Sequence, residues 1–149
     1  MRITTRIVAL CLALSMSTAW ADLRPFEDYE IGAEIISVTT VKVKVNSIDQ
    51  YLEGLRDTWV HTNKLSMELG QIKDYAIYVS QLPGSGEFNV VLTVTMANAE
   101  ALQPSKEKFD AFMKKWGEAA ADSSEKISKS YPDIRVITGE YHLRKITMK

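Results

Sequence analysis

The sequence contains few of the residues that carry chemistry in small proteins. Among 149 residues it has one cysteine, Cys11, and two histidines, His61 and His142. A lone thiol cannot form a disulfide within the chain, and two histidines without clustered carboxylates at ligand spacing argue against a metal site. No G-x-S-x-G elbow is present, and Gly84-x-Gly86 opens no helix as a phosphate loop would. We therefore predict neither a cofactor nor a metal.

The chain also has no large excess of acidic or basic residues. The chain has 18 Lys and Arg against 19 Asp and Glu, for a formal net charge of −1. A weakly acidic chain without a basic stripe argues against nucleic acid as a partner. No segment rich in proline, glycine or serine separates one part of the chain from another, so the length predicts a single domain.

The first 21 residues are typical of an export signal. Arg2 and Arg6 precede a short apolar run at residues 7–14, and Ala19-Trp20-Ala21 supplies an A-x-A end. The apolar run is too short to anchor the chain in a bilayer. The alternative is a first helix of the domain, but no acidic residue occurs before Asp22. We expect cleavage after Ala21.

Three consequences follow from cleavage at that point. The only thiol leaves with the signal peptide, so the mature chain has none. The product is exported, to the periplasm or the medium, and has no membrane contact after cleavage. The mature chain then divides into an irregular lead-in at residues 22–33 and one domain at residues 34–149.

The stretch from Thr39 to Gly70 predicts a strand followed by a long helix. Three valines alternate with two lysines over residues 41–45, the period of a strand with one apolar face. Ser47 stands three residues before Gln50, as in a capping box, so we expect the helix to begin there and to end at Gly70. Its apolar stripe is Ile48, Leu52, Leu55, Trp59, Leu65 and Leu69.

Three more strands and one more helix are predicted. Alternation of apolar residues indicates strands at 74–80, 90–96 and 135–146. The second helix opens at Pro104-Ser105 and ends before Tyr131-Pro132, because the residue before a proline is disfavoured in the helical region. The apolar stripe of this helix is Phe109, Met113, Trp116, Ala120 and Ile127.

The resulting order of elements, β-α-β-β-α-β, predicts an α+β domain. Right-handed crossovers on such a unit give a four-stranded antiparallel sheet in the order 4-1-3-2, with both helices on one face. This is the ferredoxin-like fold. It leaves the other face of the sheet bare, and a bare sheet face has to be covered or be strongly polar.

The layout resembles the dimeric α+β barrel superfamily. The resemblance rests on Lys42-Val43-Lys44-Val45 leading into a helix with Trp59, on the strands at 74–78 and 90–96, and on the closing segment 139–144. Antibiotic-biosynthesis monooxygenase-like, EthD-like and NIPSNAP-like domains belong to this group, and the resemblance covers residues 34–147. It implies a homodimer whose sheets pack bare face to bare face, with room for an aromatic or haem-like ligand.

One departure from the superfamily concerns its haem-degrading members. Those proteins tend to use an Asn, Trp and His set. Here Asn46 ends the first strand and Trp116 lies on the second helix, but that helix contains no histidine. The resemblance therefore does not extend to haem degradation.

A polar set of side chains is predicted on the bare face of the sheet. It combines cationic donors, hydroxyls, one carboxylate and one imidazole, which together could bind an anion or supply an acid-base residue. The alternative is a set of solvated or mutually paired side chains at a dimer seam. The members of this candidate pocket are Lys42, Lys44, Tyr78, Thr93, Thr95, Glu140, His142 and Arg144.

The tryptophans and the first histidine have simpler interpretations. Trp59 and Trp116 fall on apolar helix stripes and are predicted to pack in the core. His61 lies two residues from Trp59, so the two side chains point in different directions on a helix. We expect His61 at the surface, without the orienting partner that a haem ligand or general base would need.

Three functions remain open from the sequence. The first is an exported, non-catalytic homodimer that binds a small hydrophobic or anionic molecule. The second is a cofactor-independent monooxygenase or isomerase that places Tyr78, His142 and Arg144 around an aromatic substrate. The third is an interaction subunit whose bare sheet meets a different protein.

Overall fold

Four strands form one antiparallel sheet at the centre of the computed structural model, which describes residues 22–149 apart from the side chains of residues 118 and 119. They are β2 (Ile35–Val43), β3 (Asp74–Val79), β4 (Val90–Met96) and β5 (Arg135–Leu143), in the order β3-β4-β2-β5. Numbered along the chain among themselves and read from β5, these strands follow the order 4-1-3-2. The export signal predicted for residues 1–21 lies outside the described residues.

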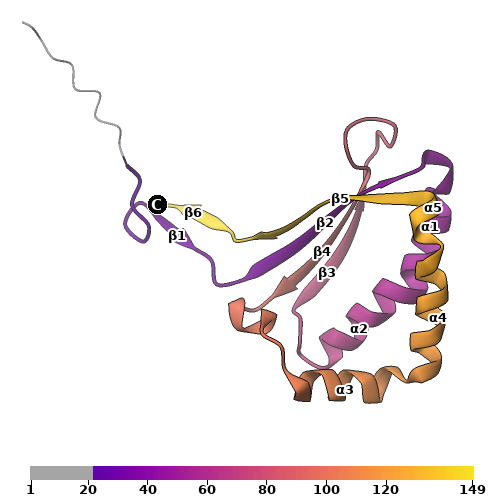
Figure 1. The fold of residues 1–149 in the computed structure, drawn as a ribbon. Helices are drawn as coiled ribbons and strands as arrows, with labels where there is room; N and C mark the ends of the chain where they lie inside the picture. The colour runs from indigo at the N-terminus through magenta and orange to yellow at the C-terminus, as the bar shows by residue number, and fades with distance from the viewer. Residues whose placement is uncertain (1–21) are drawn as a thin grey trace, which may run out of the picture.

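The helices lie on one side of this sheet (Figure 1). A first helical segment joins β2 to β3 and a second joins β4 to β5, with a short 3-10 turn η3 (Ala99–Leu102) after β4. The predicted α+β, ferredoxin-like fold is therefore confirmed. Its core forms where the first helical segment meets the sheet, around Val41, Val43, Tyr51, Leu55, Val90, Leu92 and Tyr131.

The first helical segment is continuous but not uniform. A 3-10 turn η1 (Val45–Ser47) leads into α1 (Ile48–Leu55), a π-helical turn η2 (Arg56–Val60) and α2 (His61–Glu68). The predicted capping box is wrong, because the Ser47 side chain makes no capping hydrogen bond. The predicted stop at Gly70 is confirmed: Gly70 has φ +67°, and its N–H donates to Met67 O at 2.9 Å, as in a Schellman cap.

The second helical segment is broken where a single helix was predicted. It comprises α3 (Lys106–Trp116), α4 (Glu118–Lys129) and α5 (Tyr131–Ile134). Gly117 has φ +80°, a conformation that most residues avoid, and the chain turns a sharp corner there (Figure 1). The predicted apolar stripe fails on α3, where Phe109 is 62% exposed. The predicted end before Tyr131-Pro132 is confirmed for α4, which ends at Lys129; Pro132 lies in the first turn of the separate short helix α5, where it is tolerated.

A two-stranded arm extends from the main sheet. Strand β1 (Tyr29–Ile31) pairs antiparallel with β6 (Ile146–Met148), and Figure 1 shows the pair projecting away from the helices. The prediction of an irregular segment at residues 22–33 is therefore wrong over β1. Likewise the last predicted strand, 135–146, is divided into β5 and β6.

A bulge in β5 decides which side chains share a face of the sheet. Val41 pairs with Ile137, but the preceding residue, Thr40, pairs with Gly139, so Thr138 is an extra residue. One extra residue reverses the alternation of side chains beyond it. Beyond the bulge, even-numbered residues of β5 therefore point toward the helices and odd-numbered residues toward the bare face.

Candidate functional site

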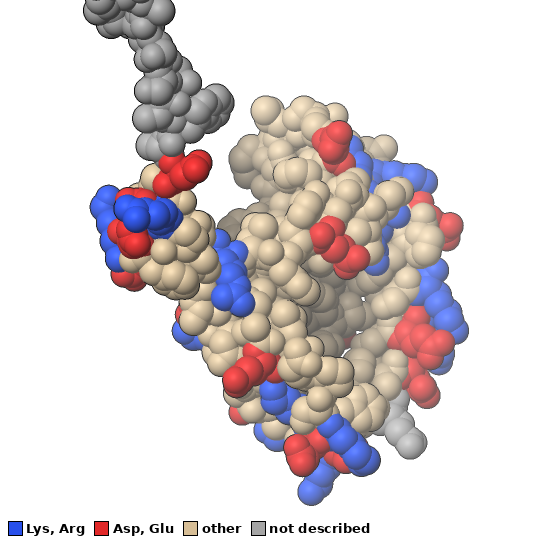
Figure 2. Space-filling model, turned by 60° about the vertical axis from the view of Figure 1, so that its left-hand side comes forward, with Lys and Arg blue, Asp and Glu red and all other residues tan. Residues whose placement is uncertain are grey.

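A combination of aromatic and polar side chains lies between the helices and the sheet. It forms a hollow of about 300 Å³, here called the helix-side hollow. Figure 2 shows this side of the molecule hollowed between two masses, with few charged side chains on the visible wall. The lining residues are Tyr51, Leu55, Thr58, Trp59, Thr62, Leu92, Trp116, Ser124, Ser128, Tyr131 and Arg135.

Arg135 supplies the only charge among the described side chains of this lining. It is the first residue of β5 and pairs with buried Val43, so its side chain points toward the helices. Its Cζ lies 5.1 Å from the ring centroid of Tyr131 and 5.6 Å from that of Tyr51, within cation–π range. Its Nε is buried and has no hydrogen-bond partner, which is rare in folded proteins. Because the side chain also lines the hollow and no described carboxylate pairs with it, the guanidinium is able to take a ligand there.

The aromatic walls of the hollow are held by edge-to-face contacts. The rings of Tyr51 and Tyr131 have centroids 5.1 Å apart at an interplanar angle of 75°. Trp59 meets Tyr75 of β3 in the same manner at 5.5 Å, and Trp116 meets Phe112 at 5.1 Å. Such contacts fix ring orientation beyond what burial alone provides. The hollow therefore has walls of defined orientation.

The π-helical turn η2 brings residues of the first helical segment to the hollow. Widening a helix by one residue frees backbone carbonyls, which must find other donors. Here Thr58 Oγ1 donates to Gly54 O at 2.8 Å, Thr62 Oγ1 to Thr58 O at 2.9 Å and Asn63 Nδ2 to Trp59 O at 2.7 Å. These side chains stabilise the irregular turn, which positions Thr58 and Trp59 in the lining.

Burial raises the pKa of the Tyr51 hydroxyl above its usual value of 10.0, although the Arg135 charge acts in the opposite direction. The folded state therefore favours the protonated phenol. This contribution to stability is fully present below about pH 10 and is lost as the pH rises through the folded-state pKa. Urea unfolding at pH 8 and pH 11 should show a smaller alkaline loss of stability for Tyr51→Phe than for the wild type.

A matched control for that experiment is Tyr29→Phe, which removes a hydroxyl from the arm, away from the hollow. It should keep the pH dependence of the wild type. Equal losses of stability between pH 8 and pH 11 for the wild type and Tyr51→Phe would contradict a raised pKa of Tyr51 in the folded state.

The eight side chains of the sequence-derived candidate pocket are divided between two faces. Lys42, Tyr78, Thr93 and Thr95 lie on the bare face, as their register with neighbouring strands shows. Lys42 is already occupied, since its Nζ donates to the carbonyls of residues 83, 85 and 86 at 3.0–3.3 Å.

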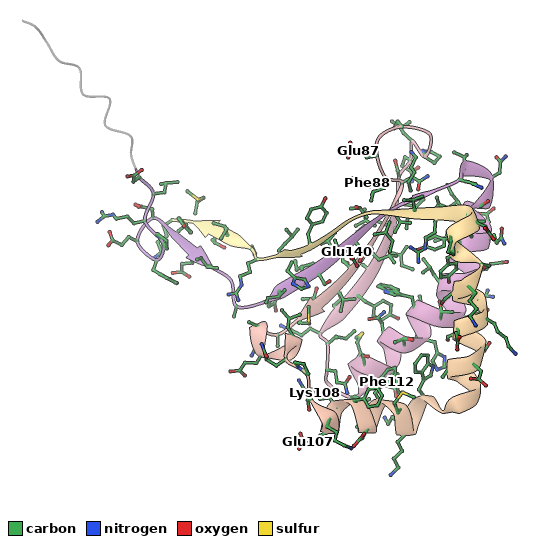
Figure 3. The ribbon with its side chains drawn as sticks, in the orientation of Figure 1. Glu87, Phe88, Glu107, Lys108, Phe112 and Glu140 are labelled. Carbon is green, nitrogen blue, oxygen red and sulfur yellow. The ribbon has the colours of Figure 1, made fainter. Side chains whose placement is uncertain are left out.

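The remaining four members lie elsewhere. Glu140 pairs with Thr39 and His142 with Ser37, so the bulge turns both toward the helices, and the prediction that they share the bare face is wrong. Figure 3 shows Glu140 on the helix side of β5. With Ser37 and Tyr141, these two residues line a separate hollow of about 270 Å³. Lys44 and Arg144 follow the ends of β2 and β5 and are exposed.

This division bears on the predicted oxygenase or isomerase. Tyr78 lies on β3 and His142 on β5, at opposite edges of the four-stranded sheet and on opposite faces. Three strand spacings separate the edges by about 14 Å. One protomer therefore does not place Tyr78 and His142 around one substrate.

The predictions for Trp59 and His61 agree with the structure, whereas Trp116, predicted in the core, lines the helix-side hollow and packs on Phe112. Trp59 is partly buried and packs against the core, and His61 is exposed at the start of α2. Within residues 22–149, no three His, Asp, Glu or Cys side chains gather as metal ligands would. None of the helices described over the same residues has the length and hydropathy needed to cross a bilayer.

Sequence comparison finds no matching family model and no matching curated protein. Three solved structures are similar to this chain. HapK from Hahella chejuensis is 10% identical and covers 74% of this chain and 91% of its own, with a TM-score of 0.46. Protein SO0527 from Shewanella oneidensis is 12% identical and covers 80% and 98%, with a TM-score of 0.40.

The third structure is described as a dimeric ferredoxin-like protein of unknown function from Thermobifida fusca YX. It is 12% identical and covers 76% of this chain and 91% of its own, with a TM-score of 0.37. Because all three TM-scores are below 0.5, the fold of this chain is assigned from its own strand order and register.

Proposed function

We propose that this protein is an exported, non-catalytic homodimer that binds a small hydrophobic or anionic molecule in the helix-side hollow. The observation that carries the binding function is the position of Arg135: a cationic group with a buried, unpartnered Nε at one end of an aromatic hollow. Pockets for small molecules combine apolar walls with a few polar groups that fix orientation, and this hollow has that composition.

The dimer is supported by the character of the bare face. Its described residues include Val136 (65% exposed), Tyr141 (52%) and Leu143 (50%), together with the threonines of β4. The charges on its strands lie toward the ends, with Asp74 opening β3 and Lys42 near the end of β2. An apolar sheet face with a central region free of charge requires a cover, and a second copy offers the same surface in return.

Leu143→Glu should weaken the dimer at least tenfold while the protomer stays folded. The exposed Leu143 side chain makes few contacts within its own chain, but an isologous interface would bury the new carboxylate twice, once from each copy. Light scattering after size exclusion, over a range of concentrations, measures the dissociation constant, and circular dichroism measures the fold.

The matched control is Phe109→Glu. Phe109 is also an exposed apolar residue (62%, against 50% for Leu143) and lies on α3, on the helix side of the sheet, so this change should leave the dimer intact. A wild-type monomer would refute the homodimer and favour a different protein as the partner of the bare face. A dimer that Leu143→Glu does not weaken would place the interface elsewhere.

Ligand occupancy is tested by native mass spectrometry and an absorbance spectrum of the protein as purified from its export compartment. We expect the mature chain to begin at Asp22 and to carry a small molecule whose mass is lost on denaturation. A mature chain that begins elsewhere would refute the cleavage site. The absence of any bound mass, together with no binding of the aromatic probes described below, would refute the binding function.

A further inference from the structure

The polar groups of the helix-side hollow restrict the charge of its ligand. Among the described residues that line it, Arg135 is the one Lys, Arg, His, Asp or Glu. No described carboxylate lies within 4.0 Å of Arg135, since the ion pairs of residues 22–149 involve other cations. A positive charge without a counter-charge in a half-enclosed site attracts an anion.

The number of donors favours one negative charge over two. A guanidinium presents parallel N–H groups that fit the two oxygens of a carboxylate. A phosphate ester dianion carries a second charge and a third oxygen, and the lining offers no second cation for them. The lining hydroxyls are partly committed already, because Thr58 and Thr62 donate to backbone carbonyls. The single negative charge of a carboxylate matches the single positive charge of Arg135.

The walls and the volume favour a flat ring as the rest of the ligand. Tyr51, Tyr131, Trp59 and Trp116 bring four ring systems to the lining, on both helical segments. Flat apolar groups gain from offset and edge-to-face packing against such rings. A volume of about 300 Å³ is at the lower end of roughly 300–1,000 Å³ for small-molecule sites, so one or two fused rings suit it.

We infer that the helix-side hollow binds a planar aromatic carboxylate, with the ring between the tryptophan and tyrosine walls and the carboxylate on Arg135. This inference rests on the proposed binding function and adds the chemical class of the ligand. Arg135 at the start of β5 gives the site its polarity, while the π-helical turn and α4 give it hydroxyl-bearing sides.

The test compares three probes that share one ring system: 2-naphthoate, 2-naphthylmethanol and 2-naphthyl phosphate. Isothermal titration calorimetry at pH 7.5 gives each dissociation constant for the purified full-length mature protein. We expect 2-naphthoate to bind about tenfold more tightly than the alcohol, because only the carboxylate forms a charge-assisted pair with Arg135. It should also bind more tightly than the phosphate, whose second negative charge has no cation in the described lining.

Arg135→Gln should remove this preference, so that 2-naphthoate and the alcohol bind with similar affinity. Arg135→Lys should keep part of this preference, because the positive charge remains but the parallel N–H groups of the guanidinium are lost. Arg144→Gln is the matched control: it removes an exposed arginine at the other end of β5 and should leave all three constants unchanged. If Arg135→Gln does not fold, the wild-type ratio of carboxylate to alcohol decides alone.

The outcomes separate this inference from the proposed function. Binding of the alcohol as tightly as the carboxylate would overturn the carboxylate class and leave ligand binding in place. Tighter binding of the phosphate would overturn it in favour of a phosphate ester. An unchanged preference in Arg135→Gln would place the anion elsewhere. No heat with any of the three probes would overturn the inference; it would also refute the binding function only if the protein as purified carries no bound mass.

Discussion

Asn89→Ala is expected to lower the free energy of unfolding by about 4 kcal/mol. The buried Asn89 side chain forms hydrogen bonds with the backbone N–H and C=O of Val43, the last residue of β2. Asn89 is 1% exposed. Its Oδ1 accepts from Val43 N at 2.8 Å, and its Nδ2 donates to Val43 O at 2.7 Å and to Pro83 O at 3.0 Å. Alanine would leave Val43 N and Val43 O buried without partners, while Pro83 O would keep the Lys42 Nζ donor at 3.3 Å.

Urea unfolding followed by circular dichroism measures this change, and thermal unfolding should show a midpoint lower by about 15 °C. Asn98→Ala is the matched control. Asn98 is exposed and its side chain accepts only from Glu100 N and Ala101 N at the start of η3, so its loss should cost about 1 kcal/mol. Equal losses for both variants would show that water replaces the Asn89 contacts.

Gly54→Ala is expected to destabilise the protein by about 2 kcal/mol, although alanine is the better helix former. A Cβ at Gly54 would lie 2.8 Å from Tyr131 Oη, 3.0 Å from its Cε1 and 3.2 Å from Ile127 Cγ2. Tyr131 cannot move freely, because it is buried against Tyr51 and Arg135. The change would separate α1 from α4 and α5 and would open one end of the helix-side hollow.

Tyr131→Phe provides the test of this cause. By itself it removes the hydrogen bond between Tyr131 Oη and Thr58 Oγ1, 3.1 Å apart, and should cost about 1 kcal/mol. Combined with Gly54→Ala it also removes the atom nearest to the new Cβ. The double variant should therefore lose less stability than the two single changes added together. Strict additivity of the two losses would show that the Tyr131 hydroxyl is not the obstacle.

Elements whose apolar pattern is regular and has a clear stop signal at its ends were predicted correctly from the sequence. Strand β4 was expected at residues 90–96 and runs from Val90 to Met96, because its alternation is bounded by a turn and a polar segment. The position of Gly70 as the stop of the first helical segment was also confirmed. In these places local pattern and tertiary packing favour the same structure.

Two of the failures lie at glycines inside predicted elements. Gly117 divides a predicted helix, and Gly139 lies at the bulge of β5. A glycine inside a helix or strand pattern signals a break, a bulge or a close approach, but the pattern alone does not say which. The outcome depends on long-range packing, which is settled only when the second helical segment docks.

The candidate site was missed for a related reason. Arg135 opens a strand just after Tyr131-Pro132, and nothing in its local pattern places it over two tyrosine rings. Ser124 and Ser128 become lining residues because α4 leaves α3 at Gly117. The spacing of Thr58 and Thr62 indicates one helix face, but the π-helical turn around them is formed by carbonyl partners that the spacing does not reveal.

The single extra residue in β5 has a consequence for comparing this chain with distant relatives. Thr138 shifts every later side chain of β5 to the opposite face, so Glu140 and His142 lie on the helix side while Tyr141 and Leu143 lie on the bare face. A homologue without that residue would exchange the two sets. An alignment that misplaces one gap here would therefore assign bare-face residues to the helix side of the sheet, even with every other position correctly matched.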